Sequence, residues 1–348
     1  MKRIAKPGTG HLPSRRRRAL TRFTLIASTL VASLAPAAAL GQGEEIAGPA
    51  YFDRRTEAAI DRSLAYLAKA QRPDGRWAKE NPVAVTALSL IAFMVEGHLP
   101  GEGAYGQTID RGIDYLLKSP DQAGYMGSSM YAHGLATLAM SEVWGMTDRD
   151  DQVKDVLKGA VKLILHAQTE EGGWRYYPRP QDADISVTAM QLVALASAKQ
   201  AGVLVPDDTV KRAIRYITMC YDPATGGFNY QPRPYSAPGF GRSAAATTAL
   251  MMCGEYDAKP VKGGVQYILN EPEQKFEKTG HYAYSHYYAI QVVYRSGPEE
   301  FAQWYPRIRD ALLAKRNEQG VVRGDEYQTA MSVIVLGAPN HFVPAYQR

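Results

Sequence analysis

The segment Gln168-Thr-Glu-Glu-Gly172-Gly-Trp174 repeats the pattern of Gln71-Arg-Pro-Asp-Gly75-Arg-Trp77. Both read Q-x-x-x-G-x-W, and Trp174 follows Trp77 by two periods of roughly 48 residues, a spacing typical of repeat proteins. Weaker copies occur at residues 125–127 and at Gly226-Gly-Phe228, and each copy stands between two apolar stretches of helical spacing. The repeat therefore predicts a chain of helical hairpins joined by glycine-aromatic loops.

The helices of this repeat are of two kinds. Stretches such as Ile109-Asp-Arg-Gly-Ile113-Asp-Tyr115-Leu116 carry an apolar stripe opposite charged residues, which is typical of a helix with one wet face. Stretches such as residues 186–195 are apolar nearly all round, which indicates burial on every side. We predict six buried helices, at about residues 83–96, 130–143, 185–200, 243–255, 284–295 and 326–337.

Six amphipathic helices that alternate with six buried ones predict an outer ring around an inner ring. The fold class is therefore all-α, a single (α/α)6 toroid of six helical hairpins, although an open superhelix would have the same pattern. We interpret the loop residues as structural: glycine permits the tight turn, the aromatic ring packs against the next hairpin, and glutamine bonds to free backbone groups. These residues are Gln71, Gly75, Trp77, Gln168, Gly172, Trp174 and Phe228.

The positive charge of the chain is concentrated in its first residues. The formal net charge is +5, but residues 1–39 hold eight basic residues and no acid, so about −3 remains for the rest. An apolar stretch over residues 23–34 and the small residues Ala37-Ala-Ala39 follow, which is the pattern of a secretory signal peptide. We predict a signal peptide over residues 1–41 and one toroid domain over residues 42–348, exported to the periplasm or the extracellular space. An uncleaved N-terminal anchor is the alternative.

This distribution of charge also bears on partners. Because the basic residues lie in the leader, binding to nucleic acid is not expected of the mature chain. No transmembrane domain is expected in residues 42–348 either, and the apolar stretch of the leader is itself too short for a comfortable membrane span. The expected partner is an apolar small molecule or a partner at the cell surface.

The Q-x-x-x-G-x-W loops resemble those of squalene and oxidosqualene cyclases, which share an α/α toroid with the β-subunits of protein prenyltransferases. The resemblance spans essentially the whole predicted domain. It is stronger still to the exported, single-toroid prenyltransferase/squalene oxidase repeat proteins of planctomycete bacteria. Met130-Tyr-Ala-His-Gly134 and Gly172-Gly-Trp-Arg-Tyr176 are similar to recurring segments of that group, as is the terminal segment Val343-Pro-Ala-Tyr-Gln-Arg348. The resemblance implies the toroid fold and does not by itself imply an activity.

Asp184 is the sharpest candidate for chemistry. Class II terpene cyclases protonate an alkene with an Asp of a D-x-D-D-T-A segment, and the resemblance implies that Asp182-Ala-Asp184-Ile-Ser-Val-Thr188-Ala189 is the matching segment. Alignment on Thr-Ala puts Asp184 on the first family Asp, but Ser186 and Val187 stand where the other two acids belong. The family's proton donor is therefore missing in this register. Asp184 and Asp182 are candidate acids, and the alternative is that Asp184 or Ser186 caps the helix.

Further candidates follow from the expected convergence of the inner-helix N-termini at one mouth, where free N–H groups favour an anionic group or the chain's own acids. His133 and His286 are candidate acid–base residues or hydrogen-bonded structural groups. The segment from His281 to Tyr288 holds four tyrosines and two histidines, which suit either acid–base chemistry or an aromatic wall. The candidate ligand-binding residues are Tyr131, Ser186, Arg242, Tyr284, Tyr287 and Tyr288.

No metal site and no cofactor is predicted. Protein prenyltransferases hold zinc through Asp, Cys and His with a D-x-C pairing, and neither Cys220 nor Cys253 follows an Asp by two residues. The two cysteines are expected near the C-terminal ends of consecutive antiparallel helices, too far apart for a disulfide. We predict that both are buried thiols.

Three functions remain open at this point. The leading hypothesis is a central cavity that binds an apolar, isoprenoid-like or other lipidic ligand, with residual cyclase-type acid chemistry through Asp184. The second is a non-enzymatic module that docks a protein or glycan at the cell surface, which predicts a small or solid centre and exposed aromatic residues at the rim. The third is a polysaccharide lyase or hydrolase, which needs an open polar groove and paired acid–base residues. The choice among them depends on the volume that the inner helices enclose. Whether the protein is an enzyme stays open, because the D-x-D-D acid motif and the zinc ligands are incomplete or absent.

Overall fold

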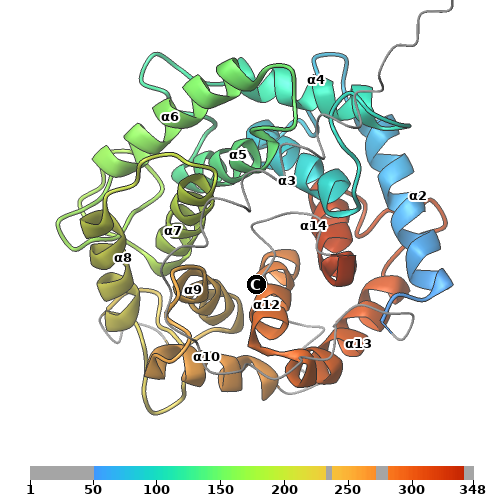
Figure 1. Ribbon diagram of the computed structural model, residues 1–348. Helices are drawn as coiled ribbons and strands as arrows, with labels where there is room; N and C mark the ends of the chain where they lie inside the picture. Colours follow the sequence, from blue (N-terminus) through green and yellow to red (C-terminus); the bar gives the residue numbers. More distant parts are fainter. Residues whose placement is uncertain (1–50, 233–236, 272–280, 341–348) are drawn as a thin grey trace, which may run out of the picture. The chain divides into compact units, whose positions relative to one another are not determined.

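The computed structural model describes residues 51–232, 237–271 and 281–340, and these residues form twelve α-helices and one short 3-10 helix, η1 (Ala338–Asn340). Six helices lie on the outside (Figure 1): α2 (Arg54–Ala70), α4 (Gly106–Leu117), α6 (Asp150–His166), α8 (Asp207–Met219), α10 (Lys259–Leu269) and α13 (Pro298–Ala314). Six lie inside: α3 (Pro82–Val95), α5 (Met130–Val143), α7 (Ile185–Gln200), α9 (Phe240–Met252), α12 (Tyr282–Ser296) and α14 (Glu326–Leu336).

The inner helices form a closed ring. Each packs against the next along the chain, and α14 packs against α3, so the last hairpin meets the first (Figure 1). The prediction of an all-α, (α/α)6 toroid is confirmed, and the open superhelix is excluded for this part of the chain. None of the described helices is long and apolar enough to cross a membrane. The predicted signal peptide, residues 1–41, lies outside the described residues, so it and the domain boundary at residue 42 stay predictions.

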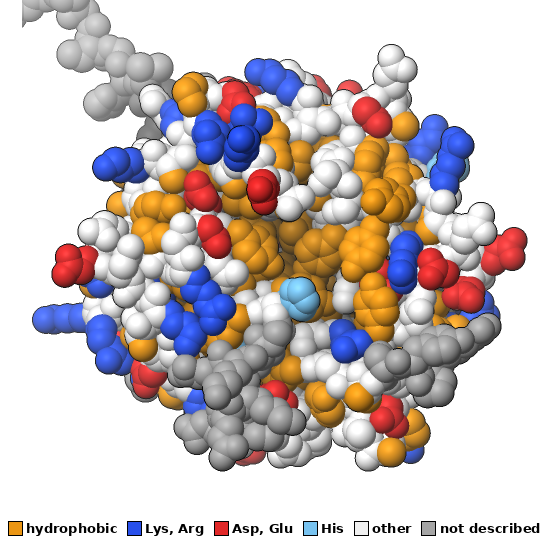
Figure 2. Space-filling view, turned by 180° about the vertical axis from the view of Figure 1, so that it is seen from behind, with side chains coloured by type: hydrophobic (Ala, Val, Ile, Leu, Met, Phe, Trp, Pro, Cys, Tyr) orange, Lys and Arg blue, Asp and Glu red, His pale blue; other side chains and the backbone are white. Residues whose placement is uncertain are grey.

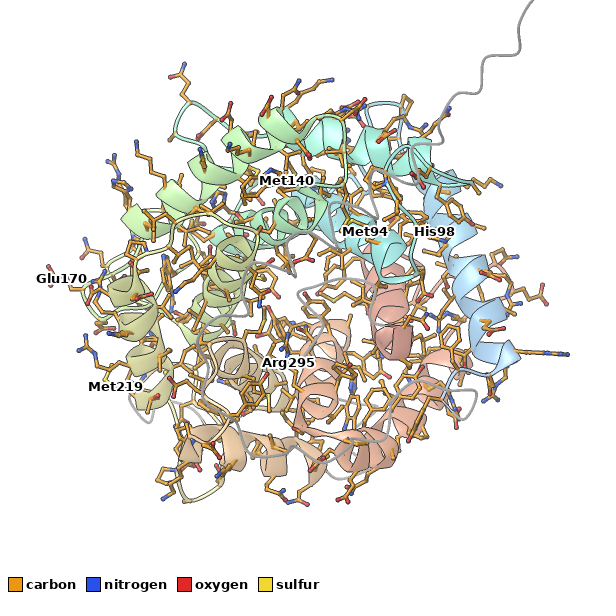
Figure 3. All side chains as sticks on the ribbon, in the orientation of Figure 1. Met94, His98, Met140, Glu170, Met219 and Arg295 are labelled. Carbon is orange, nitrogen blue, oxygen red and sulfur yellow. The ribbon has the colours of Figure 1, made fainter. Side chains whose placement is uncertain are left out.

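The sequences of the helices explain why those of the inner ring are more deeply buried than those of the outer ring. Every residue of α3 except Pro82 is buried, whereas α8 buries only four of its residues on one stripe. Side chains fill the space between the rings (Figure 3), where Met140 is buried, while Met219 and Glu170 are exposed on the outside. An apolar surface on every side thus places a helix in the inner ring, where the core of the toroid lies.

Four of the six inner helices differ by one to three residues from their predicted ranges, and α9 differs most. α9 begins at Phe240, because Phe240 is buried and extends the apolar surface beyond the run of small residues, and it ends at Met252. Gly254 follows with a φ of +88°, a conformation that commonly ends helices. Cys220 is buried as predicted and Cys253 is only partly buried, and both are free thiols.

The two Q-x-x-x-G-x-W loops make the same contacts. The Gln71 side-chain amide donates to the carbonyl oxygens of Gly75 and Thr108, both at 2.9 Å, and the indole N–H of Trp77 donates to Leu67 O at 2.6 Å. In the second loop, Gln168 donates to Gly172 O at 2.8 Å and Thr209 O at 2.9 Å, and Trp174 donates to Ile164 O at 2.7 Å. Both indoles are fully buried. Each loop therefore fastens its own hairpin to the outer helix of the next.

Candidate functional site

The N-terminal ends of the inner helices meet at one face of the toroid, here called the N-terminal mouth. Tyr131 lies in the first turn of α5, and its hydroxyl oxygen is 3.3 Å from that of Tyr288 on α12. The helices α5 and α12 stand on opposite sides of the inner ring (Figure 1). The rings of Tyr131 and Tyr284 lie 6.0 Å apart, and those of Tyr284 and Tyr288 lie 5.1 Å apart. We call Tyr131, Tyr284 and Tyr288 the tyrosine layer.

The tyrosine layer closes the centre of the ring at its own level. The Tyr288 hydroxyl donates to the sulfur of Met190 on α7 at 3.3 Å, and its ring packs edge-on against Tyr287. Tyr287 and Tyr288 are fully buried, while Tyr131 and Tyr284 remain partly exposed. In the view from this side, hydrophobic side chains gather around a recess at the centre of the face (Figure 2). Tyr131 and Tyr284 are therefore the members of the layer that a ligand in this recess would meet.

Burial also fixes the protonation of the layer. Removal from water raises the pKa of Tyr131 and of Tyr288 well above 10, and it raises that of Tyr284 as well. The neighbouring hydroxyl groups add to the effect for Tyr131. These side chains stay neutral at physiological pH, so they offer aromatic surface and hydroxyl groups rather than a base.

Asp184 lies beside this layer as the N-cap of α7. Its Oδ1 accepts hydrogen bonds from the backbone N–H groups of Ser186 at 2.9 Å and Val187 at 3.0 Å. Its Oδ2 is buried and lies 3.8 Å from the Arg175 guanidinium. Burial raises the pKa of Asp184 to about 6, although the Val187 hydrogen bond and the charge of Arg175 oppose this.

Arg175 connects the two candidate acids with the rim of the mouth. It also lies 3.5 Å from the exposed Asp182. Its guanidinium stands over the rings of Tyr176 and Tyr230, 5.7 Å and 5.5 Å from their centres, which is cation–π geometry. Arg242 lies over Tyr230 at 5.9 Å, and the hydroxyl oxygens of Tyr176 and Tyr230 are 3.2 Å apart. Asp182 and Asp184 are thus each paired with Arg175 rather than with each other.

Ser186 links this group to the tyrosine layer. It follows Asp184 by two residues, is half-buried, and lies close enough to Tyr284 to lower the pKa of its hydroxyl, against the larger effect of burial. The structure thus brings together Tyr131, Ser186, Tyr284 and Tyr288 with Asp184, and places Arg242 and Asp182 at the rim. Tyr287 is fully buried, and its ring packs against that of Tyr288 beneath the exposed surface.

His133 lies away from this group, and both of its ring nitrogens have structural partners. Nδ1 accepts from the backbone N–H of Met126 at 3.0 Å, and Nε2 is 3.1 Å from the carbonyl oxygen of Ala160, which requires the proton on Nε2. Burial lowers the pKa of His133 to about 4. The same register of the other repeats holds Thr86, Thr188, Ser243 and Thr329, whose hydroxyl oxygens accept the corresponding loop N–H.

His286 is also separate from Asp184. It is buried between the inner and outer rings, 4.4 Å from the ring of Tyr282 and 5.6 Å from those of Phe240 and Trp304. Among residues 51–232, 237–271 and 281–340, no group of three or more His, Cys, Asp or Glu side chains could hold a metal ion.

Sequence reasoning missed Arg175 and Tyr230, two side chains from outside α7 that act on the Asp184 carboxyl group. Arg175 follows Trp174 directly, and in the sequence it stands out only as part of the segment Gly172-Gly-Trp-Arg-Tyr176. The available signal for Tyr230 is sequence length: ten residues, 229–238, separate Phe228 from the N-cap of α9, whereas two residues, 127–128, separate Met126 from the N-cap of α5. Long insertions between the helices of a repeat often carry function.

No protein-family model matches this chain. Its sequence is 30% identical over 115 residues to squalene–hopene cyclase of Alicyclobacillus acidocaldarius, which covers 33% of this chain and 17% of that protein. It is 25% identical over 140 residues to lanosterol synthase of Saccharomyces cerevisiae, covering 36% of this chain and 19% of the relative. The matched segments thus span less than a fifth of these relatives.

Several solved structures share the fold over most of the chain. An inactive variant of the α-1,6-mannanase GH76A of Salegentibacter, in complex with α-1,6-mannotriose, is 9% identical with a TM-score of 0.66, covering 82% of this chain and 99% of that one. The type II terpene cyclase MstE from Scytonema, in complex with geranylgeranyl dihydroxybenzoate, is 12% identical with a TM-score of 0.60, covering 83% and 98%. Cellobiose 2-epimerase of Bacillus thermoamylovorans is 14% identical, also with a TM-score of 0.60, covering 82% and 99%.

Together these similarities support a terpenoid-cyclase-like α/α toroid, as the loop resemblance implied. Because the solved structures include both a terpene cyclase and glycan-active enzymes, their likeness shows the fold alone. The resemblance to the exported planctomycete group stays a prediction.

Proposed function

We propose that the protein binds an apolar, isoprenoid-like or other lipidic ligand in the recess over the tyrosine layer. The observation that carries this proposal is the layer itself: three aromatic rings from opposite inner helices meet at the centre of the mouth, and two of them are partly exposed. Their neutral, apolar ring surfaces suit an apolar ligand. Figure 2 places hydrophobic side chains around the recess and charged side chains mostly farther out.

The closure between Tyr131 and Tyr288 limits how deep such a ligand reaches. Since their hydroxyl oxygens are 3.3 Å apart across the ring, the ligand rests on the layer rather than passing through it. A shallower site at the mouth thus takes the place of the expected central cavity, and a centre closed at this level is a feature that the docking-module hypothesis predicts. The terpene cyclase MstE, whose structure holds geranylgeranyl dihydroxybenzoate, supports an apolar ligand on this fold by analogy.

Binding, rather than acid catalysis, is the proposed function. Asp184 lies beside an aromatic recess, and its pKa of about 6 lets a fraction of its carboxyl groups keep their proton near neutral pH, as a proton donor must. However, the Asp184 Oδ2 is buried and faces Arg175, so proton transfer to a ligand would require Arg175 to move. The two hydrogen bonds to Oδ1 are those of a helix cap.

Mass spectrometry of an organic extract from the purified protein tests this proposal. We expect a stoichiometric lipid or isoprenoid in the wild type and a large loss of it in Tyr284→Ala, because the variant removes an exposed ring of the layer. Tyr177→Ala, which changes a tyrosine that is 69% exposed, is the matched control and should keep the ligand. If extracts of the folded wild type are empty and added geranylgeraniol does not bind saturably, the proposal is wrong.

A second candidate is the docking of a glycan at the rim. The observation that favours it is the exposure of Tyr176 and Tyr177, 41% and 69%, of which Tyr176 lies under the Arg175 guanidinium. Exposed aromatic rings next to charged groups are typical of recognition surfaces. Loss of glycan binding in Tyr176→Ala, with lipid content unchanged, would favour this function. The lipid proposal instead expects Tyr284→Ala to lose the lipid.

A further inference from the structure

A cavity separate from the recess over the tyrosine layer also lies at the N-terminal side of the toroid, between the start of α3 and the turn that joins α4 to α5. Its volume is about 380 Å³, and its walls include Val83, Tyr115, Lys118, Gly127, Ser128 and Ala132. Val83 and Ala132 are buried, Tyr115 is half-buried, and Lys118 and Ser128 are exposed at the edge. None of these residues belongs to the tyrosine layer or to the rim around Arg175.

The position of Tyr115 in the repeat explains why this cavity exists. Gly112-Ile113-Asp114-Tyr115 on α4 matches Ala213-Ile214-Arg215-Tyr216 on α8 and Gly264-Val265-Gln266-Tyr267 on α10. The match holds in space as well, because a Cβ added to Gly112 would meet Trp77 and one added to Gly264 would meet Phe228, the loop aromatics of the preceding hairpins. The three tyrosines are therefore equivalent residues of three repeats.

Two of the three tyrosines bind a loop of their own chain. The Tyr216 hydroxyl donates to Ala183 O at 2.6 Å, and the Tyr267 hydroxyl donates to Pro238 O at 3.2 Å. Ala183 and Pro238 end the long stretches 175–183 and 229–238 that follow Trp174 and Phe228. The matching stretch after Trp77 is only residues 78–80, and within the described part of the chain no loop carbonyl oxygen accepts a hydrogen bond from Tyr115. In this repeat the cavity therefore lies where the longer stretches of the other two repeats meet their tyrosines.

We propose that this cavity binds a small carboxylic acid with a short apolar body. In the equivalent repeats the tyrosine hydroxyl donates to a carbonyl oxygen, so Tyr115 would donate to an oxygen of the ligand. Lys118 is the only charged residue among the described residues of the lining, and it favours a negative charge on that group. The buried side chains of Val83 and Ala132 provide the apolar floor.

Titration of the purified protein with phenylacetate, followed by saturation-transfer NMR, tests the site directly. We expect saturable binding with a millimolar Kd that weakens about fivefold in Tyr115→Phe, as loss of one hydrogen bond implies. Ser128→Trp, which fills the cavity from its edge, should abolish binding. Lys118→Met should weaken phenylacetate but not the uncharged phenylacetamide.

Two matched controls separate this site from the others. Tyr216→Phe makes the same chemical change at the equivalent tyrosine, whose loop already occupies the place, and should leave phenylacetate binding unchanged. Tyr284→Ala, which tests the lipid site, should also leave it unchanged. The proposal is overturned if binding is not saturable, or if Tyr115→Phe and Ser128→Trp both bind phenylacetate as the wild type does.

Discussion

Gly172 and Gly145 have nearly the same backbone conformation in different surroundings. Their φ values are +96° and +91°, both in the region that residues with a Cβ seldom adopt. A Cβ at Gly172 would lie 2.5 Å from the carbonyl oxygen of Arg212, whereas nothing lies within 4 Å of one at Gly145. Gly172 is therefore required both for its conformation and for the close approach of α8, and Gly145 for its conformation alone.

This difference predicts that replacement by alanine lowers the free energy of unfolding more at Gly172 than at Gly145. Gly145→Ala should lower the free energy of unfolding by about 1 kcal/mol, the cost of a left-handed residue with a Cβ. Gly172→Ala should cost about 3 kcal/mol or more, because the backbone must also move away from Arg212. Urea denaturation of both variants measures the difference. Equal losses would mean that the loop yields freely and does not fasten neighbouring hairpins.

At the scale of residues, the sequence predicts the role of the loop residues but leaves two roles open for the histidines, acid–base chemistry and structural hydrogen bonding. The repetition of Gln, Gly and Trp at fixed spacing was enough to place them in equivalent turns. His133 looked like a candidate acid–base residue because its type alone suggests that chemistry. Its partner is the N–H of Met126, and only the comparison with Thr86 and Thr188 in the same register indicates a loop-fastening residue.

Among the elements, α3 ends at an acid that links the first hairpin to the last. Glu96 accepts a hydrogen bond from the Asn340 side chain at 2.8 Å. Burial raises the pKa of Glu96 to about 8. Because the folded pKa lies above the unfolded value of 4.5, the folded protein keeps this proton over a range in which the unfolded chain has lost it. The contribution of Glu96 to stability is thus present below pH 4.5 and is lost as the pH rises toward 8.

Glu96→Gln should therefore flatten the dependence of stability on pH. The amide keeps an acceptor for Asn340 but does not ionise, so the variant should be more stable than the wild type at pH 9, by up to about 5 kcal/mol. The difference should become small at pH 5. Thermal unfolding from pH 5 to 9 measures it, with Glu170→Gln on the exposed surface as the control. A wild type that stays more stable than Glu96→Gln at pH 9 would contradict the assignment.

The helices themselves were predictable because hydrophobic periodicity depends on the chain alone. Inner helices such as α5 and α7 have their predicted ranges, since their apolar surface begins at a capping residue, Ser129 or Asp184. The meeting of Tyr131 with Tyr288 was not predictable in this way. It depends on how side chains from α5 and α12 reach across the ring, which no local pattern encodes.

For the molecule as a whole, the repeat predicted hairpins but left ring closure open. Closure depends on the small rotation from one hairpin to the next, which accumulates around the ring. The structure supplies specific contacts at the junction: the Ser63 hydroxyl on α2 donates to Gly320 O at 2.7 Å, and Arg316 donates to the same hydroxyl at 3.1 Å. The start of the domain and its last hairpin are thus joined by polar contacts as well as by the packing of α14 on α3.

A closed ring responds to the loss of a hairpin differently from an open array. In an open array, removal of a terminal repeat costs one interface, and the rest stays folded. Here a chain that ends at Gly297 lacks α13 and α14, so it exposes the buried faces of both α12 and α3 and of α2 beside them. We expect this chain to lose cooperative thermal unfolding and to bind a hydrophobic dye such as anilinonaphthalene sulfonate at 25 °C. A sharp transition with only a modestly lower Tm would instead mean that five hairpins are stable by themselves and that closure adds little.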